Sequence, residues 1–152
     1  MTKQARKHAL GLAGEFLVAG ELLRRNVRAS VTYGNAKSAD VVALSASGTK
    51  ATVVEVKTTS AKEWVIGTSV PAPSAQLWVL VYLPLDDALG PEFYIMTSEE
   101  LHSILGPLDA AYRKKFLERH EREFAGGGVV ALSYSAAQPH RSQWSKITNC
   151  ID

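Results

Sequence analysis

Residues 40–58 read DVVALSASGTKATVVEVKT, and this stretch decides the fold. Two valine-rich runs, 40–44 and 52–58, flank a short polar segment that contains Gly48. Apolar β-branched runs separated by a Ser- and Gly-containing segment are typical of two antiparallel strands joined by a turn. The sequence therefore predicts a β-hairpin centred near Gly48.

Three charged side chains lie within this otherwise apolar hairpin. If Val42 lies opposite Val53, the same register places Asp40 opposite Glu55 on one face of the hairpin. Lys57 comes two residues after Glu55 and shares that face, because side chains alternate along a strand. This register predicts that two carboxylates and one ammonium converge at one end of the hairpin.

Two adjacent carboxylates among valines repel each other, and burying an unpartnered charge is costly. A divalent cation would offset this cost, because Mg²⁺ binds carboxylate oxygens and retains positions for water and phosphate. Asp40 and Glu55 would each supply one oxygen, and the carbonyl of Val56 a further one. Lys57 would then hold the metal-activated water or neutralise charge on a phosphate. A purely structural cluster, in which Lys57 pairs with both acids, is the alternative.

An N-terminal helix is predicted over residues 5–26, and its glycines suggest close packing against a sheet. Its apolar residues recur at helical spacing: Leu12, Phe16, Ala19 and Leu23. Glu15 lies beside this stripe, so a helix packed on the sheet would bring it to the carboxylates as a further metal ligand. An exposed glutamate on the helix surface is the alternative.

The remaining elements predict an α/β fold with a central mixed sheet of four to five strands flanked by helices, in one domain over residues 1–152. Further strands are expected at 27–33, 77–83, 93–96 and 129–134. One helix is expected to begin after a Thr97 or Ser98 cap, and another to span 110–124. Residues 58–76 predict no helix, but an extended hairpin around Trp64 or a loop that approaches the substrate; Gln76 receives no role.

The ordered motif resembles the PD-(D/E)xK nuclease superfamily, most closely its small Holliday-junction-resolvase-like members. The resemblance covers roughly residues 8–60 and rests on these elements: Gly14-Glu15, Ala39-Asp40 and Glu55-Val56-Lys57. It implies a restriction-endonuclease-like core and Mg²⁺- or Mn²⁺-dependent hydrolysis of DNA phosphodiesters. It also implies that Asp40 and Glu55 bind the metal, that Lys57 positions or activates the water, and that Glu15 is an auxiliary acid.

The sequence departs from the family pattern in two places. Ala39 stands where the motif has proline, although the metal ligand is the acid that follows. Many members also carry a Gln or His on a helix after the lysine-bearing strand, and residues 58–76 predict no such helix. A catalytically degenerate module that binds protein or nucleic acid, or an unrelated α/β domain with a structural ion network, are the alternatives to an enzyme.

Four residues near the motif are predicted to contact the DNA substrate: Asn35, Lys37, Lys62 and Trp64. Lysine and aromatic side chains bind nucleic acid strands through charge and stacking. Core packing is the alternative for Trp64. Because a single metal site cuts one strand, a duplex or branched substrate also predicts a homodimer.

The composition of the chain excludes several other classes of protein. The 152-residue chain has a net charge of +2 and one cysteine, Cys150, which excludes an intrachain disulfide and a cysteine-rich zinc site and fits the reducing cytoplasm. No uncharged apolar run of about 18 residues and no convincing signal peptide are found, so no membrane association is expected. Residues 1–28 hold six basic and two acidic side chains, which indicates either a nucleic-acid contact or a solvated helix face.

Overall fold

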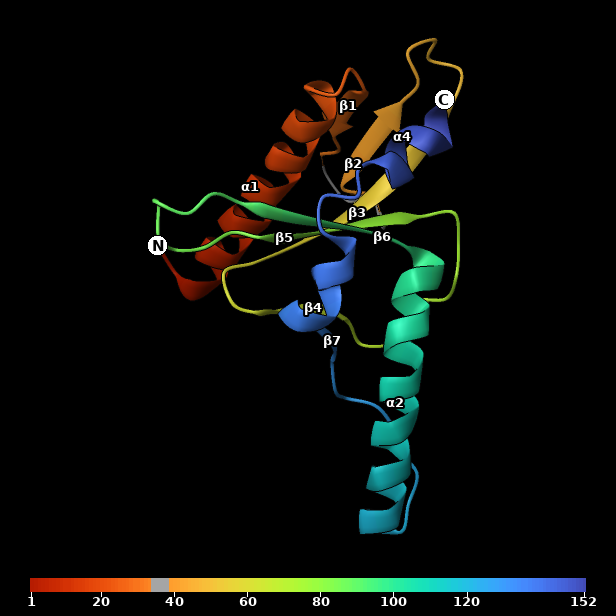
Figure 1. Cartoon of the computed structure of the whole chain (residues 1–152). Helices are drawn as coiled ribbons and strands as arrows, with labels where there is room; N and C mark the ends of the chain where they lie inside the picture. Colours follow the sequence, from red (N-terminus) through yellow and green to blue (C-terminus); the bar gives the residue numbers. More distant parts are fainter. Residues whose placement is uncertain (34–38) are drawn as a thin grey trace.

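The computed structural model of the chain describes residues 1–33 and 39–152 (Figure 1). Its elements are α1 (Lys3–Leu23), β1 (Arg28–Val31), β2 (Val41–Leu44), β3 (Ala51–Thr59), β4 (Glu63–Gly67), β5 (Leu77–Tyr82), β6 (Glu92–Thr97), α2 (Ser98–His120), β7 (Val130–Ser133), α3 (Tyr134–Ala137), the 3₁₀ helix η1 (Gln138–His140) and α4 (Ser145–Ile151). A five-stranded sheet has the order β1-β2-β3-β5-β6, and β4 pairs with β7 in a separate two-stranded sheet. The predicted α/β fold with a mixed central sheet flanked by helices is confirmed.

Two apolar layers enclose the central sheet. On one face, α1 and α4 cover a layer that includes Val54 and Val56 of β3 and Val18 of α1. On the other face, β4, β7 and α2 cover a layer that includes Trp78 and Leu80 of β5. Figure 1 shows α1 and α4 on one side of the sheet and α2 extending away from the other side. Among the described helices, none is long and apolar enough to cross a membrane.

The predicted hairpin and its register are confirmed. β2 and β3 are antiparallel, and Val42 lies opposite Val53. The connecting turn is closed by a hydrogen bond of 2.9 Å from Gly48 N–H to the Ser45 carbonyl. Gly48 has a φ of +74°, a left-handed conformation that glycine adopts without steric cost. β3 then pairs with β5 in parallel, which makes the sheet mixed.

The apolar stripe predicted for α1 is wrong in orientation, although the helix itself is confirmed. Phe16 and Leu23 are 51% and 54% exposed. The buried residues of α1 are Gly14, Val18, Ala19 and Leu22. Gly14 explains the rotation, because a Cβ there would overlap the Thr58 hydroxyl oxygen on β3 and lie 2.9 Å from Thr58 Cβ. The helix therefore turns its smallest residue, rather than its aromatic one, toward the sheet.

Two other predictions change in the structure. Instead of two separate helices, α2 is a single helix that continues through Pro107. Pro107 is exposed, and because it has no N–H it removes one backbone hydrogen bond from the helix. The predicted cap is confirmed, since Thr97 and Glu100 form a reciprocal capping box.

Residues 58–76 do contain the expected strand, but β4 pairs with the distant β7 rather than forming a local hairpin.

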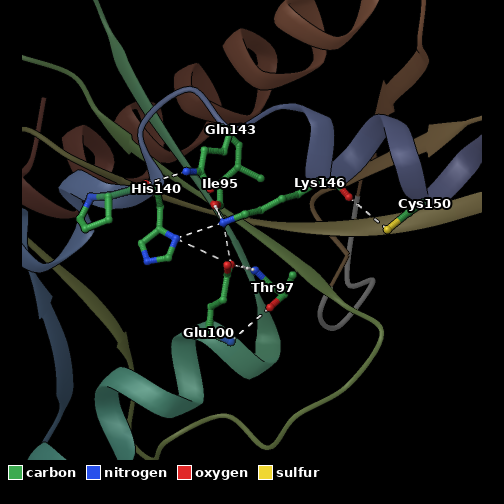
Figure 2. Close-up of polar contacts among 8 residues, drawn as sticks. Ile95, Thr97, Glu100, His140, Gln143, Lys146 and Cys150 are labelled. Carbon is green, nitrogen blue, oxygen red and sulfur yellow. Dashed lines mark hydrogen bonds and ion pairs between the residues drawn. The ribbon is translucent and has the colours of Figure 1, made fainter.

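A polar cluster joins the start of α2 to the C-terminal segment (Figure 2). The Lys146 ammonium donates to Glu100 Oε2 at 2.7 Å and to the Ile95 carbonyl at 3.0 Å. It also lies 3.0 Å from His140 Nδ1. Because an ammonium group only donates, Nδ1 must accept, which leaves the imidazole neutral with its proton on Nε2. Burial, reinforced by the positive charge of Lys146, lowers the pKa of His140, and the Glu100 carboxylate offsets part of this effect.

Replacing Gly14 tests the contact between α1 and β3. We expect Gly14→Ala to lower the free energy of unfolding by about 1–3 kcal/mol, because the stiff, packed Thr58 cannot move away from the new methyl group. Gly11→Ala is the matched control, because no atom lies within 4 Å of a Cβ at Gly11. That control should be neutral or stabilise the protein by up to about 1 kcal/mol. Urea denaturation measures both, and equal effects of the two substitutions would contradict this packing.

Titration of His140 should make the stability depend on pH. Its folded-state pKa is lower than the ordinary value of 6.5, so between these two pKa values the unfolded chain binds more protons. The free energy of unfolding should therefore fall as the pH falls from 6.5 toward the folded-state pKa, with a slope below about 1.4 kcal/mol per pH unit. His140→Asn retains an acceptor near Lys146 and should flatten this slope. Equal slopes in denaturant titrations of both proteins would rule out the assignment.

Candidate active site

The predicted motif lies where β3 extends past the end of β2. Within the described residues, the ladder between β2 and β3 ends at the pair Val41–Val54. From Val54 to Thr59, β3 continues to pair with β5 on its other side. Among residues 1–33 and 39–152, no strand pairs with β3 beyond Val54 on the side from which β2 arrives, and this part of β3 carries Glu55 and Lys57.

Asp40 closes the first part of this open edge with its side chain. Its backbone N–H donates to the Val54 carbonyl at 3.1 Å, and its own carbonyl accepts from Thr32 N–H at 2.9 Å. The Asp40 Oδ2 atom accepts a hydrogen bond of 2.8 Å from Val56 N–H. The hairpin register predicts Asp40 opposite Glu55, whereas in the structure the chain bends at Asp40 and its carboxylate accepts from Val56 N–H. A carboxylate thus replaces the missing strand as the acceptor for β3.

Glu55 and Lys57 form an ion pair on one face of β3, as the alternation of side chains predicts. The Lys57 ammonium lies 2.6 Å from Glu55 Oε1. The side chains are only partly accessible, with 13% of Glu55 and 29% of Lys57 exposed. Lys57 also lies 5.9 Å from the centre of the Trp78 ring, which belongs to the neighbouring strand. The pair is thus held between an aromatic surface and the solvent-accessible edge.

Glu15 belongs to the same electrostatic environment. Partial burial raises the pKa of Glu15, and the negative charge of Asp40 raises it further, as does the more weakly acting charge of Glu55. His8 and Lys57 act in the opposite direction. The contact of Gly14 with β3 fixes this part of α1, so Glu15 is carried to the end of the sheet where the other acids lie. Glu15 thus senses the charges of the strand motif, and its role as a further metal ligand stays a prediction.

Gln76 is a site residue to which the sequence analysis assigned no role. Its side-chain amide donates to Glu55 Oε2 at 3.4 Å. Gln76 precedes β5, whose Trp78 lies beside Glu55 in the parallel register. Its proximity follows from this register between strands that are distant in the sequence. In the sequence, the signal for this position was that Gln76 lies two residues before Trp78, and so on the same face of the strand.

Carboxylate oxygens are the ligands that a hard divalent cation prefers, but these acids are not arranged around one common position. Among residues 1–33 and 39–152, no group of three or more His, Cys, Asp or Glu side chains is arranged to hold a metal ion. Both Glu55 oxygens already accept hydrogen bonds, from Lys57 and Gln76. Burial is the main cause of the raised pKa of Glu15, and the charges of Asp40 and Glu55 add to it; a cation would offset the part that comes from these charges. Metal binding by Asp40, Glu55, Glu15 and the Val56 carbonyl therefore stays a prediction.

The predicted substrate contacts have different outcomes. Asn35 and Lys37 lie outside the described residues. Trp64 is 1% exposed, and its Nε1–H donates to the Val81 carbonyl at 2.9 Å, so the prediction that it contacts DNA is wrong and core packing holds instead. Lys62 is exposed, and its ammonium lies 4.4 Å from the centre of the Tyr134 ring. Its contact with a substrate stays a prediction.

Comparison with known proteins adds no assignment to this geometry. No protein-family model matches the sequence. No curated protein is similar enough to it to count as a match.

Proposed function

We propose that the chain is a metal-dependent endonuclease that hydrolyses DNA phosphodiester bonds. Asp40 and Glu55 would bind Mg²⁺ or Mn²⁺, with Glu15 as an auxiliary acid and Lys57 as the residue that positions the attacking water. The observation that carries the proposal is the hydrogen bond between the Asp40 carboxylate and Val56 N–H. It brings one acid to the same segment of β3 as the Glu55–Lys57 pair.

Lys57 supports this role through its charge and its donors. A protonated lysine has no acceptor, so it holds a water molecule or a phosphate oxygen by donating to it rather than by removing a proton. Its present partner, Glu55 Oε1, would be shared between the ammonium and a cation. A divalent ion at the carboxylates would lower the pKa of a bound water and polarise the phosphate. Hydrolysis then forms a bond from the water oxygen to phosphorus while the bond to the leaving sugar oxygen breaks.

A binding module without activity is the second candidate. The close Glu55–Lys57 ion pair favours it, because such a pair is also stable as a purely structural contact. In that case the chain would bind nucleic acid or protein without cleaving DNA.

As an enzyme on duplex or branched DNA, the protein would act in the cytoplasm as a two-fold homodimer, with one metal site for each strand.

A cleavage assay separates the two candidates. Purified protein is incubated with plasmid, linear duplex, branched and single-stranded DNA in the presence of Mg²⁺ or Mn²⁺. We expect cleavage of at least one substrate, loss of cleavage on adding a chelator, and a fall of about 10²-fold or more for Lys57→Ala. Lys114→Ala, on the exposed part of α2, is the matched lysine control and should cleave at the wild-type rate.

Two results would contradict the enzyme. One is the absence of cleavage of all four substrates by the wild-type protein, which would favour the binding module. The other is Lys57→Ala cleaving as fast as Lys114→Ala, because the activity would then come from another site or from a contaminant.

A further inference from the structure

The first turns of α1 form an exposed basic segment next to the candidate site. Residues 1–9 are all exposed, and they include Lys3, Arg6 and Lys7. No Asp or Glu occurs in the sequence before Glu15. The near-neutral net charge of the whole chain therefore conceals a local concentration of positive charge.

Several other basic residues pair with acids close to them in sequence. Arg24 and Arg25, at the other end of α1, both pair with Glu21. Arg113 pairs with Asp109 on α2. In the described ranges 1–33 and 39–152, no acidic side chain forms an ion pair with Lys3, Arg6 or Lys7. Their charge is therefore available to an external anion.

Helical spacing connects this segment to the candidate site. Four residues of α1 follow one another at spacings of four, four and three, and so form one ridge along the helix: Lys3, Lys7, Gly11 and Gly14. Gly14 is the point of contact with Thr58 of β3. With a rise of about 1.5 Å per residue, Lys7 and Lys3 lie about 10 and 16 Å further along the helix axis. Within the part of the chain that the structure describes, no atom lies within 4 Å of a Cβ at Gly11, so no described residue covers the ridge at that point.

We propose that Lys3, Arg6 and Lys7 bind backbone phosphates of a DNA strand whose scissile phosphate lies at the edge of β3. The choice of DNA as the polyanion rests on the proposed nuclease function. Phosphate contacts of this kind position a nucleic acid without reading its sequence, which suits a site that has to hold the strand beside the carboxylates. Positive charge on α1 also offsets the repulsion between those carboxylates and the phosphates.

An anionic membrane is the other polyanionic surface that a basic helix can bind, but this segment is poorly suited to it. Helices that lie in the membrane interface bury large apolar side chains on the face opposite their lysines. Between Thr2 and Ala9 the apolar residues are alanines alone. The segment therefore has charge without an apolar face to insert.

A salt titration tests the proposal. The variant Lys3→Gln/Arg6→Gln/Lys7→Gln is compared with Lys114→Gln/Lys115→Gln/Arg119→Gln, which removes three charges from the exposed part of α2. Both sets of substitutions are made in a Lys57→Ala background, with Mg²⁺ present, so that bound DNA stays intact. Fluorescence anisotropy of a short labelled duplex gives the dissociation constant over about 50–200 mM salt. Thermal unfolding checks that each variant is folded.

The α1 variant should lose about 0.9 in the slope of log affinity against log salt for each phosphate contact removed, up to about 2.7 in total. The α2 variant should keep the slope of the parent protein. Equal slopes for the parent and the α1 variant, an equal loss in both variants, or no binding of duplex by the parent would overturn the proposal. Tighter binding to phosphatidylserine vesicles than to DNA would overturn it as well.

These results are separable from the test of catalysis. If the wild-type protein cleaves DNA and the α1 substitutions leave the salt slope unchanged, the phosphate contacts are refuted and the nuclease stands. If the α1 substitutions lower the slope but the wild-type protein cleaves no DNA, the contacts stand and the nuclease is refuted.

Discussion

The hydrogen bond from Val56 N–H to Asp40 Oδ2 is the constraint on which the proposed site depends. β2 stops pairing with β3 at Val54, which would leave the next backbone donors of β3 on an open edge. A main-chain partner there would complete the ladder, but it would also cover the edge. A carboxylate satisfies the donor and places an acid next to the segment of β3 that carries Glu55 and Lys57. The same bond thus ends the strand pairing and creates the electrostatics of the site.

The crowding of acids explains why a cation is the natural complement. Glu15 carries a raised pKa because it is partly buried and because Asp40 and Glu55 lie near it. Packing contributes to its position, since the neighbouring Gly14 lies against Thr58 of β3 without room for a Cβ. Protonation relieves such crowding at low pH, and a divalent ion relieves it near neutral pH. Lys57 compensates one of the three negative charges and leaves the others to be balanced.

Local rules in the sequence predict most of the fold and the core of the site, and contacts between distant segments account for the rest. The pairing of Val42 with Val53 follows from two valine runs and a turn, and it brings Asp40 close to the strand that carries the ion pair. Helical periodicity predicted that Phe16 faces the core, but its side chain is exposed, because the contact of Gly14 with the sheet sets the orientation of α1. Gln76 could not be assigned, because its place depends on the parallel register of β3 and β5.

Calorimetric titration of Mn²⁺ into the wild-type protein and Asp40→Asn tests the central claim most directly. The asparagine retains an oxygen that accepts from Val56 N–H, so it removes the negative charge while preserving the local fold. The account predicts saturable binding of Mn²⁺ to the wild-type protein and affinity at least about tenfold weaker for Asp40→Asn, about 1.4 kcal/mol, with an unchanged melting temperature. Absence of Mn²⁺ binding to the wild-type protein, or equal affinity in both, would contradict the claim that these carboxylates form a metal site.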